Sequence, residues 1–165
     1  MDPWDCRAEL VRATFQKESV SEELALEMLE AAIGKARELG KAFAIAVVDE
    51  SGVLKSFIRM DGAPLISVQV AIDKAYTAAG YGLPTHRWYE LLMEDRPLAM
   101  GAHAINRLIV FGGGYPISVG GRIVGGVGVS GGNAEEDMKV AEAALEVLDK
   151  SDTSRGDRER AQEHT

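Results

Sequence analysis

The sequence predicts an α+β fold, in which a small antiparallel sheet is flanked by helices. Two observations lead to this class. Apolar residues recur at helical spacing near both ends of the chain, and between them two apolar segments are each interrupted by a tight turn. Strands joined by short turns pair antiparallel, and amphipathic helices bury their apolar stripe against such a sheet. A length of 165 residues suggests one domain.

The first helix is expected after residues 1–18, which show no clear period and are interpreted as an N-terminal arm. Ser19 and Glu22 fit a capping box, with Ser19 as the N-cap. Apolar side chains then recur at helical spacing as far as Leu39, and Gly40 is a natural stop.

Two hairpins are predicted. In the first, the apolar run 43–48 predicts a buried strand that turns and returns over 53–59. In the second, strands over 115–119 and 122–129 are separated by Gly120–Gly121. Consecutive glycines favour the positive φ angles that match the twist of a hairpin.

A second helix is predicted over residues 65–79, between the hairpins. Its apolar stripe is rich in alanine, which indicates close backbone packing, and the sheet is the expected partner. Thr85 is expected to cap a short helix over 86–93, and residues 94–106 look irregular with one further helical turn.

Asn133 is expected to cap the last helix, with Glu136 at its third position and an apolar face that ends near Leu148. Residues 149–165 contain no strong hydrophobe and form a polar, mixed-charge tail. The domain is therefore expected over 19–148. The order of its elements is that of a profilin-like or PAS-like fold.

The composition restricts the partners. A net charge of −8 argues against nucleic acid and against an anionic membrane surface. The single cysteine, Cys6, excludes an internal disulfide, and the N-terminal segment lacks the apolar stretch of a signal peptide. No run approaches the roughly 18 apolar residues of a membrane-spanning helix. A cytoplasmic protein is expected.

Four segments carry a resemblance to a known family. They are residues 44–63 (AIAVVDESGVLKSFIRMDGA), 71–85 (AIDKAYTAAGYGLPT), 112–132 (GGGYPISVGGRIVGGVGVSGG) and the helix that contains Asp137. Together they resemble the GlcG/HbpS family of small bacterial haem-binding-like proteins, which is also similar to the C-terminal domain of PduO. The resemblance implies a self-associating profilin-like domain with a pocket near helix 65–79. It also implies haem binding, haem degradation or a role in glycolate or diol operons.

Lys74 is the strongest single candidate for a functional residue, because it lies in a helix built otherwise mainly from alanine and β-branched residues. A desolvated lysine has a lowered pKa and acts as an acid, a base or an amine nucleophile. Lys74 also matches the lysine of the resembling family. The alternative is a lysine that pairs with a carboxylate or reaches the surface. Thr77 and Tyr81 are expected close to it on the same side of the helix.

Further candidates surround this helix. Arg59 is a candidate to hold a carboxylate or a haem propionate, whereas Asp61 is expected to cap the helix or pair with Arg59. His86 and His103 are candidates to ligate haem iron or to move protons. Their separation of 17 residues matches no recognised metal motif, so no metal site is assigned. The junction at Gly131–Gly132 is a candidate anion site.

Two functional hypotheses follow. The first is a ligand-binding protein for haem or another tetrapyrrole, held by Arg59, Lys74, Thr77, His86, His103 and the glycine junction. The second is a small cytosolic enzyme (a tautomerase, deaminase, lyase or hydratase) that acts on a carboxylate substrate, with Arg59 holding the acid and Lys74 or His86 moving a proton. An oligomeric scaffold is a third interpretation. Homo-oligomerisation is expected in each case.

Overall fold

The computed structural model describes residues 13–162, so residues 1–12 of the predicted arm and 163–165 of the predicted tail lie outside it. The elements follow in the order α2 (Glu22–Glu38), β1 (Ala44–Asp49), β2 (Leu54–Arg59), α3 (Leu65–Tyr81), the 3-10 helix η1 (Thr85–Arg87), α4 (Trp88–Glu94), α5 (Arg96–Gly101), η2 (Ala102–Ala104), β3 (Gly114–Val119), β4 (Arg122–Ser130) and α6 (Ala134–Gln162).

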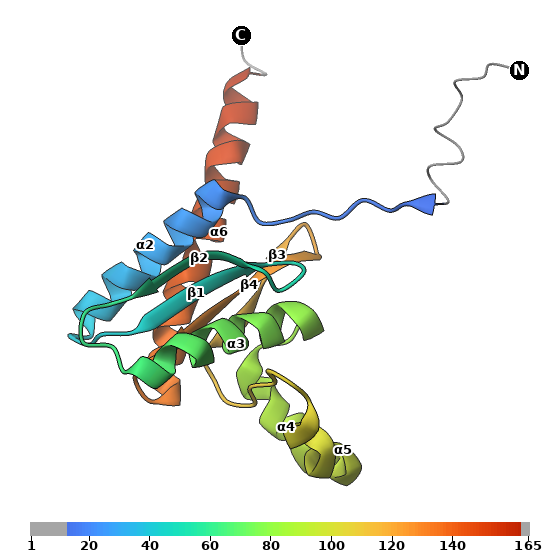
Figure 1. The fold of residues 1–165 in the computed structure, drawn as a ribbon. Coiled ribbons are helices and arrows are strands. Elements are labelled where there is room, and N and C mark those ends of the chain that lie inside the picture. The colour runs from blue at the N-terminus through green and yellow to red at the C-terminus, as the bar shows by residue number, and fades with distance from the viewer. Residues whose placement is uncertain (1–12, 163–165) are drawn as a thin grey trace, which may run out of the picture.

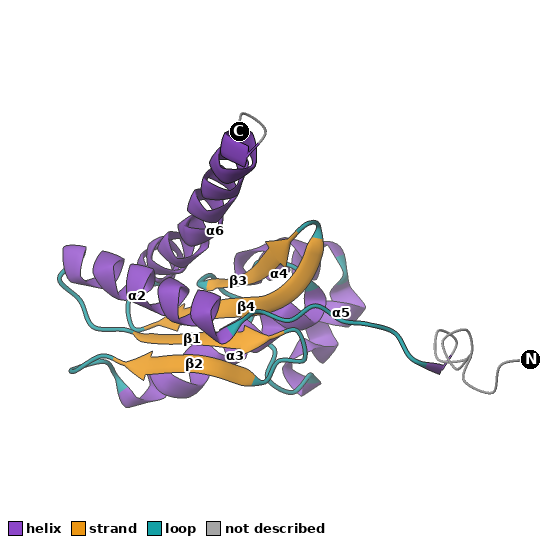
Figure 2. Ribbon diagram, turned by 90° about the horizontal axis from the view of Figure 1, so that it is seen from above, coloured by secondary structure: helices purple, strands orange, loops and turns teal. Residues whose placement is uncertain are grey.

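The four strands form one antiparallel sheet in the order β2-β1-β4-β3. Helix α3 covers one face, while α2 and α6 cover the other (Figure 1 and Figure 2). The predicted α+β class with a helix-flanked antiparallel sheet is therefore confirmed. Short helices α4 and α5 form a hairpin that projects from the end of α3, away from the sheet (Figure 1).

The helix ends show which sequence signals act. The N-cap of α2 is Ser21 and not Ser19: its hydroxyl accepts a hydrogen bond from the Leu24 N–H at 3.1 Å. Gly40 ends this helix with φ 65°, as expected of a left-handed C-terminal glycine. At α6 the predicted capping box is present, since Asn133 Oδ1 accepts from the Glu136 N–H at 2.9 Å and Glu136 Oε2 accepts from the Asn133 N–H at 3.0 Å.

The predicted irregular segment is more helical than expected. Thr85 does not cap a helix through its side chain, because its buried hydroxyl accepts a hydrogen bond from the Gly114 N–H at 2.9 Å. The cap in this region is Asp95, which accepts from Leu98 N–H at 3.0 Å and starts α5. The Thr85 side chain thus joins η1 to Gly114, the first residue of β3.

Large side chains fill the face of the sheet under α2 and α6. Alternate residues of β1 (Phe43 just before it, then Ile45 and Val47) are directed to this side and pack on Met28 of α2 and Val140 of α6. All are essentially inaccessible to solvent. Burial of side chains this size contributes roughly 1.5–3 kcal/mol each, so this layer is the main hydrophobic core.

The face under α3 is built differently. Here β1 presents Ala44, Ala46 and Val48 to Ala71, Ala75 and Ala79 of α3. On β4, a Cβ atom at Gly126 or Gly128 would overlap the backbone of α3 itself. The alanine stripe therefore packs on a glycine row, and the helix axis approaches the sheet more closely than bulky side chains allow.

The sheet has two open edges, β2 and β3. Strand β3 contains Pro116, which is paired with Gly126 of β4. Proline lacks an N–H and is confined in sheets to edge strands, strand starts and bulges, so its position agrees with the topology. Within residues 13–162, no helix is both long enough and apolar enough to cross a membrane.

Candidate functional site

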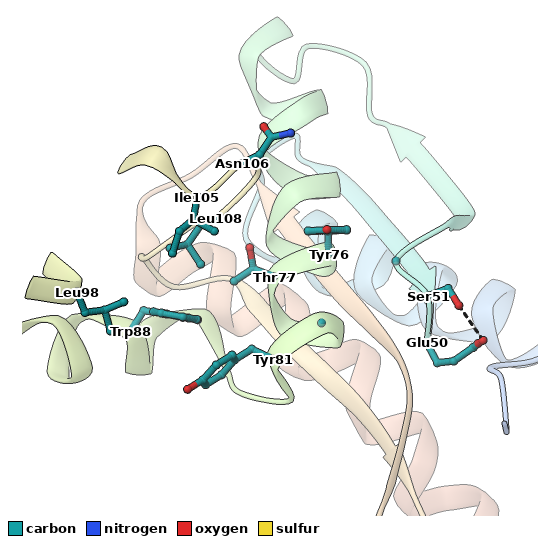
Figure 3. A pocket seen from close by; sticks show the side chains of 12 residues that line it. Glu50, Ser51, Tyr76, Thr77, Tyr81, Trp88, Leu98, Ile105, Asn106 and Leu108 are labelled. Atoms are coloured by element: carbon teal, nitrogen blue, oxygen red, sulfur yellow. Dashed lines mark hydrogen bonds between the residues drawn. The ribbon is translucent and has the colours of Figure 1, made fainter. Parts of the chain in front are cut away.

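A cavity of about 410 Å³ lies beside the C-terminal half of α3. Its lining comes from three parts of the chain: the β1–β2 turn, α3, and the segment from α4 to residue 108. The residues that line it are Glu50, Ser51, Gly52, Tyr76, Thr77, Gly80, Tyr81, Trp88, Leu98, Ile105, Asn106 and Leu108 (Figure 3). The size lies within the range of pockets that hold organic ligands, about 300–1,000 Å³.

An aromatic pair forms one side of this pocket. The rings of Tyr81 and Trp88 lie 4.8 Å apart between centroids and are tilted by 53°, beside Leu98 in Figure 3. Trp88 is 5% exposed, and its indole Nε1 has no hydrogen-bond acceptor among the described residues. Tyr81 is 63% exposed. The aromatic wall is thus half buried and half open to solvent.

Thr77 fixes the opposite rim. Its hydroxyl donates a hydrogen bond to the Arg107 carbonyl at 3.0 Å and accepts one from the Ile109 N–H at 3.0 Å. These two bonds attach the segment that follows η2 to the middle of α3. Thr77 was predicted to bind a cofactor, and it does line the pocket, but its hydroxyl is already paired within the protein.

A carboxylate closes the pocket at the β1–β2 turn. Glu50 accepts a hydrogen bond from the Ser51 hydroxyl at 3.1 Å, while its second oxygen, Oε2, is buried without a partner among the described residues. A hydrogen bond from Ser19 is the main cause that lowers the pKa of Glu50 below its usual value. The pocket therefore carries negative charge at this end.

Lys74 is not part of this pocket. Its ammonium is fully buried, and it donates to Asp137 Oδ2 at 2.7 Å and to the Val129 carbonyl at 2.9 Å. The ring of Phe111 covers it, with its centroid 5.0 Å from Nζ. Burial lowers the pKa of Lys74 and raises that of Asp137, since desolvation disfavours both charges. This arrangement matches the alternative of a carboxylate-paired lysine.

The glycine-rich segment 112–114 encloses this ion pair. A Cβ on Gly113 would lie 2.8 Å from Lys74 Nζ and 2.7 Å from the Val129 carbonyl oxygen. Gly113 has φ 118°, a left-handed conformation that favours glycine. The glycines thus allow the backbone to approach the pair and exclude water from it.

The expected convergence of polar groups along α3 is not found. Lys74 is directed to Asp137, Thr77 to the backbone of residues 107–109, and Tyr81 to Trp88. Arg59 is exposed on the edge strand β2, and its guanidinium donates twice to the Ala63 carbonyl, at 3.0 and 2.9 Å. It stabilises the entry to α3, and the structure does not bring it to Lys74.

The two histidines also lie apart from the lining. His86, in η1, packs on Tyr115 of β3 with 5.8 Å between ring centroids, and its Nδ1 is buried without a partner among residues 13–162. His103 is exposed in η2, which leads directly into the lining residues Ile105 and Asn106. The part of the chain that the structure describes holds no cluster of three or more His, Cys, Asp or Glu side chains suited to a metal ion.

The junction before α6 is occupied by the protein's own carboxylates. The Gly132 N–H donates to Asp137 Oδ1 at 2.9 Å. A Cβ on Gly131 would lie 2.7 Å from the Ala42 carbonyl oxygen, so this glycine is required by packing. The candidate anion site therefore faces two acidic groups, Glu136 and Asp137, which would repel an anion.

Sequence reasoning missed most of the lining, notably Glu50, Tyr76, Trp88 and Leu108. The aromatic and functional groups gathered over residues 86–106 are the signal that points to this region. That signal does not show which side chains are directed to α3.

Among solved structures, the fold is similar to Klebsiella pneumoniae ORFY, with a TM-score of 0.74 and 33% identity over 81% of this chain and 92% of that one. It is similar to HbpS, with a TM-score of 0.76 and 30% identity over 82% and 94%. It is also similar to a PduOC:haem complex, with a TM-score of 0.72 and 30% identity over 77% and 93%.

Among curated proteins, an uncharacterised 15.0 kDa protein from the dhaT-dhaS intergenic region of Citrobacter freundii is 36% identical over 75% of this chain and 88% of its own length. The corrinoid adenosyltransferase PduO of the same organism is 33% identical, but the match covers only 37% of that protein. A family model described as haem degrading protein HbpS-like matches residues 20–146, and the chain therefore belongs to the HbpS-like family.

Proposed function

We propose that this protein binds a small planar ligand of the haem or tetrapyrrole class in the pocket outside α3. The observation that carries the proposal is the half-open apolar pocket with the Tyr81–Trp88 aromatic pair at its side. Aromatic and aliphatic walls suit the faces of a macrocycle, and an open mouth suits its polar edge. A relative of the same fold, PduOC, has been crystallised with haem.

The residues present fit such a ligand in size and polarity. Leu98, Ile105 and Leu108 supply aliphatic contacts, and the ring faces of Tyr81 and Trp88 supply aromatic ones. Haem, when bound, would contribute an iron centre capable of redox and oxygen chemistry. The protein's own part is to bind and orient the group and to exclude water from one of its faces.

His103, ahead of His86, is the residue that would ligate the haem iron. Its short helix η2 leads into the pocket lining at Ile105, and its side chain is exposed and free to turn. His86 instead packs on Tyr115 of β3, outside the pocket lining.

A haemin titration followed by visible spectroscopy tests the proposal. Wild-type protein is expected to give a saturable Soret shift. His103→Ala is expected to change the position of the Soret band, whereas His86→Ala leaves it unchanged. A band that is unaffected by His103→Ala would reject this ligand, and a band altered by His86→Ala would assign the role to His86.

A matched pair of variants tests the location. Leu108→Arg places a charge in the pocket, and Leu26→Arg places the same charge on an exposed apolar position of α2. The proposal expects haemin binding to be lost in the first and kept in the second. Equal affinity in both variants would move the ligand to another site.

The enzyme hypothesis has less support from the contacts. It requires a free amine near a carboxylate clamp, but the Lys74 ammonium is paired and Arg59 is bound to Ala63. We therefore place Lys74 in a structural role.

We also propose self-association, as the sequence predicted. Several large apolar side chains are more than half exposed, with Leu65, Ile66 and Met100 all at 75% or above. Such surfaces are usually covered in an assembly. Light scattering at micromolar concentration is expected to report more than one chain per particle, and a monomer there would reject the proposal.

A further inference from the structure

Arg107 adopts an unusual backbone conformation next to the pocket, between two of the residues that line it. Its φ is 64°, and it is the one non-glycine residue with positive φ in the described chain. This left-handed conformation costs free energy for a residue with a Cβ, and such residues concentrate at functional sites. The two hydrogen bonds of Thr77, to the Arg107 carbonyl and the Ile109 N–H, hold the backbone in this state.

The side chain of Arg107 is held as firmly as its backbone. Its guanidinium carbon lies 3.8 Å from the ring centroid of Tyr76, which lines the pocket. Its Nε donates to Asp73 Oδ1 at 2.7 Å, and Gln69 donates to the same oxygen at 3.0 Å. A stacked and hydrogen-bonded guanidinium has lost most of its rotational freedom before any ligand arrives.

The two Nη groups have no hydrogen-bond or salt-bridge partner among residues 13–162, and the side chain is 31% exposed. Its sequence neighbours Asn106 and Leu108 both line the pocket. The fork of N–H donors at the rim has the geometry that a carboxylate accepts. Asp73 reduces the net charge of the site but leaves these donors available.

The two ends of the pocket carry opposite charges, which would orient a charged ligand. Glu50 lies at the opposite rim, on the β1–β2 turn, with its pKa lowered so that it is ionised at neutral pH. An anionic group is repelled at that end and accepted at the Arg107 end. We infer that Arg107 binds a carboxylate of the pocket's ligand and so selects planar apolar ligands that carry an acid group. This inference rests on the function proposed above.

The test compares each acid with its ester. Haemin and haemin dimethyl ester, and separately 1-pyrenebutyrate and its methyl ester, are titrated into the wild type, Arg107→Met and Arg107→Gly. Glycine suits the left-handed conformation and preserves the loop if methionine disturbs it. Arg37→Met is the matched control, an exposed arginine near the end of α2, on the other face of the sheet.

The wild type and Arg37→Met are expected to bind each acid about tenfold or more tightly than its ester, as a charge-assisted hydrogen bond provides. Both Arg107 variants are expected to lose this preference while their affinity for the esters stays within about twofold of wild type, because a structural role would lower both.

Equal wild-type binding of acid and ester, or a preference kept in both Arg107 variants, would overturn the inference. If haemin does not bind but pyrenebutyrate shows the Arg107-dependent preference, the haem proposal fails and the carboxylate site stands. If neither acid binds, both fail.

Discussion

The two faces of the sheet are packed by side chains of different size, large under α2 and α6 and small under α3. Under α2 and α6, side chains such as Phe43 and Met28 fill the space between the layers. Under α3, alanines meet a glycine row, and a Cβ atom at Gly126 or Gly128 would overlap the helix backbone. Strand β1 serves both faces, with Ile45 directed to one and Ala46 to the other.

This difference indicates which helix can carry ligand-binding side chains without loss of stability. The core under α2 and α6 supplies most of the buried apolar surface, so stability does not depend on large side chains around α3. The outer side of α3 is then free to carry Tyr76, Thr77 and Tyr81, which line the pocket. The buried charge of Lys74 pairs with Asp137 and so ties α3 to α6, the helices of the two opposite faces.

The largest effect is expected from Lys74→Met, because it leaves the Asp137 carboxylate buried without its partner. Loss of one member of a buried pair costs about 3–5 kcal/mol. Urea unfolding measures this change. Lys139→Met, which breaks an exposed Lys–Glu pair on α6, should leave the unfolding midpoint unchanged. A second change, Asp137→Leu, should restore much of the stability of Lys74→Met, and a further loss would contradict the account.

A smaller effect is expected from Gly128→Ala, where one methyl group must displace the backbone of α3. Overpacking of this kind costs about 1–3 kcal/mol. On the other face, Ile45→Val removes one methyl group and is expected to cost about 0.5–1.5 kcal/mol. If Gly128→Ala lowered the free energy of unfolding less than Ile45→Val, the close contact of α3 with β4 would not restrict side-chain size at Gly128.

A pH series distinguishes two carboxylates, Glu50 of the β1–β2 turn and Asp137 of α6. The folded-state pKa of Glu50 is lowered, so its contribution to stability is present above the unfolded value, about 4.3, and is lost as pH falls through the folded value. Glu50→Gln should therefore reduce the thermal midpoint at pH 7, and the reduction should shrink as the pH falls below the unfolded value. For Asp137 the raised pKa gives the opposite sign, so its contribution is greatest in acid and is lost as pH rises. A Glu50→Gln effect that grew in acid would reverse this assignment.

The smallest effect is expected from removal of the polar tail. In Figure 1 the last turns of α6 extend beyond α2 and the sheet, and the sequence there lacks strong hydrophobes. A chain that ends at Asp149 is expected to keep one cooperative thermal transition. A broad or absent transition would assign the tail to the folded domain.

Sequence patterns located the layers better than the site. The apolar period placed α2, α3 and both hairpins within a few residues, because burial on one face repeats along each element. Thr77 and Tyr81 were expected beside Lys74 on one side of α3, but the three side chains are directed to different partners. Their roles were not predictable, since the partner of Lys74 is Asp137, 63 residues further along the chain. A pattern within one helix carries no information about a contact at that separation.

The exposed edge of strand β3 affects whether the sheets of two chains can join in concentrated solution. An uncovered strand edge offers a row of N–H and C=O groups on which a further strand can add, and repetition of that step leads to aggregates. At Pro116 the row lacks a donor, and the register shift after Ile117 interrupts the strand's regular pairing. Continuous growth of the sheet from this edge is therefore disfavoured.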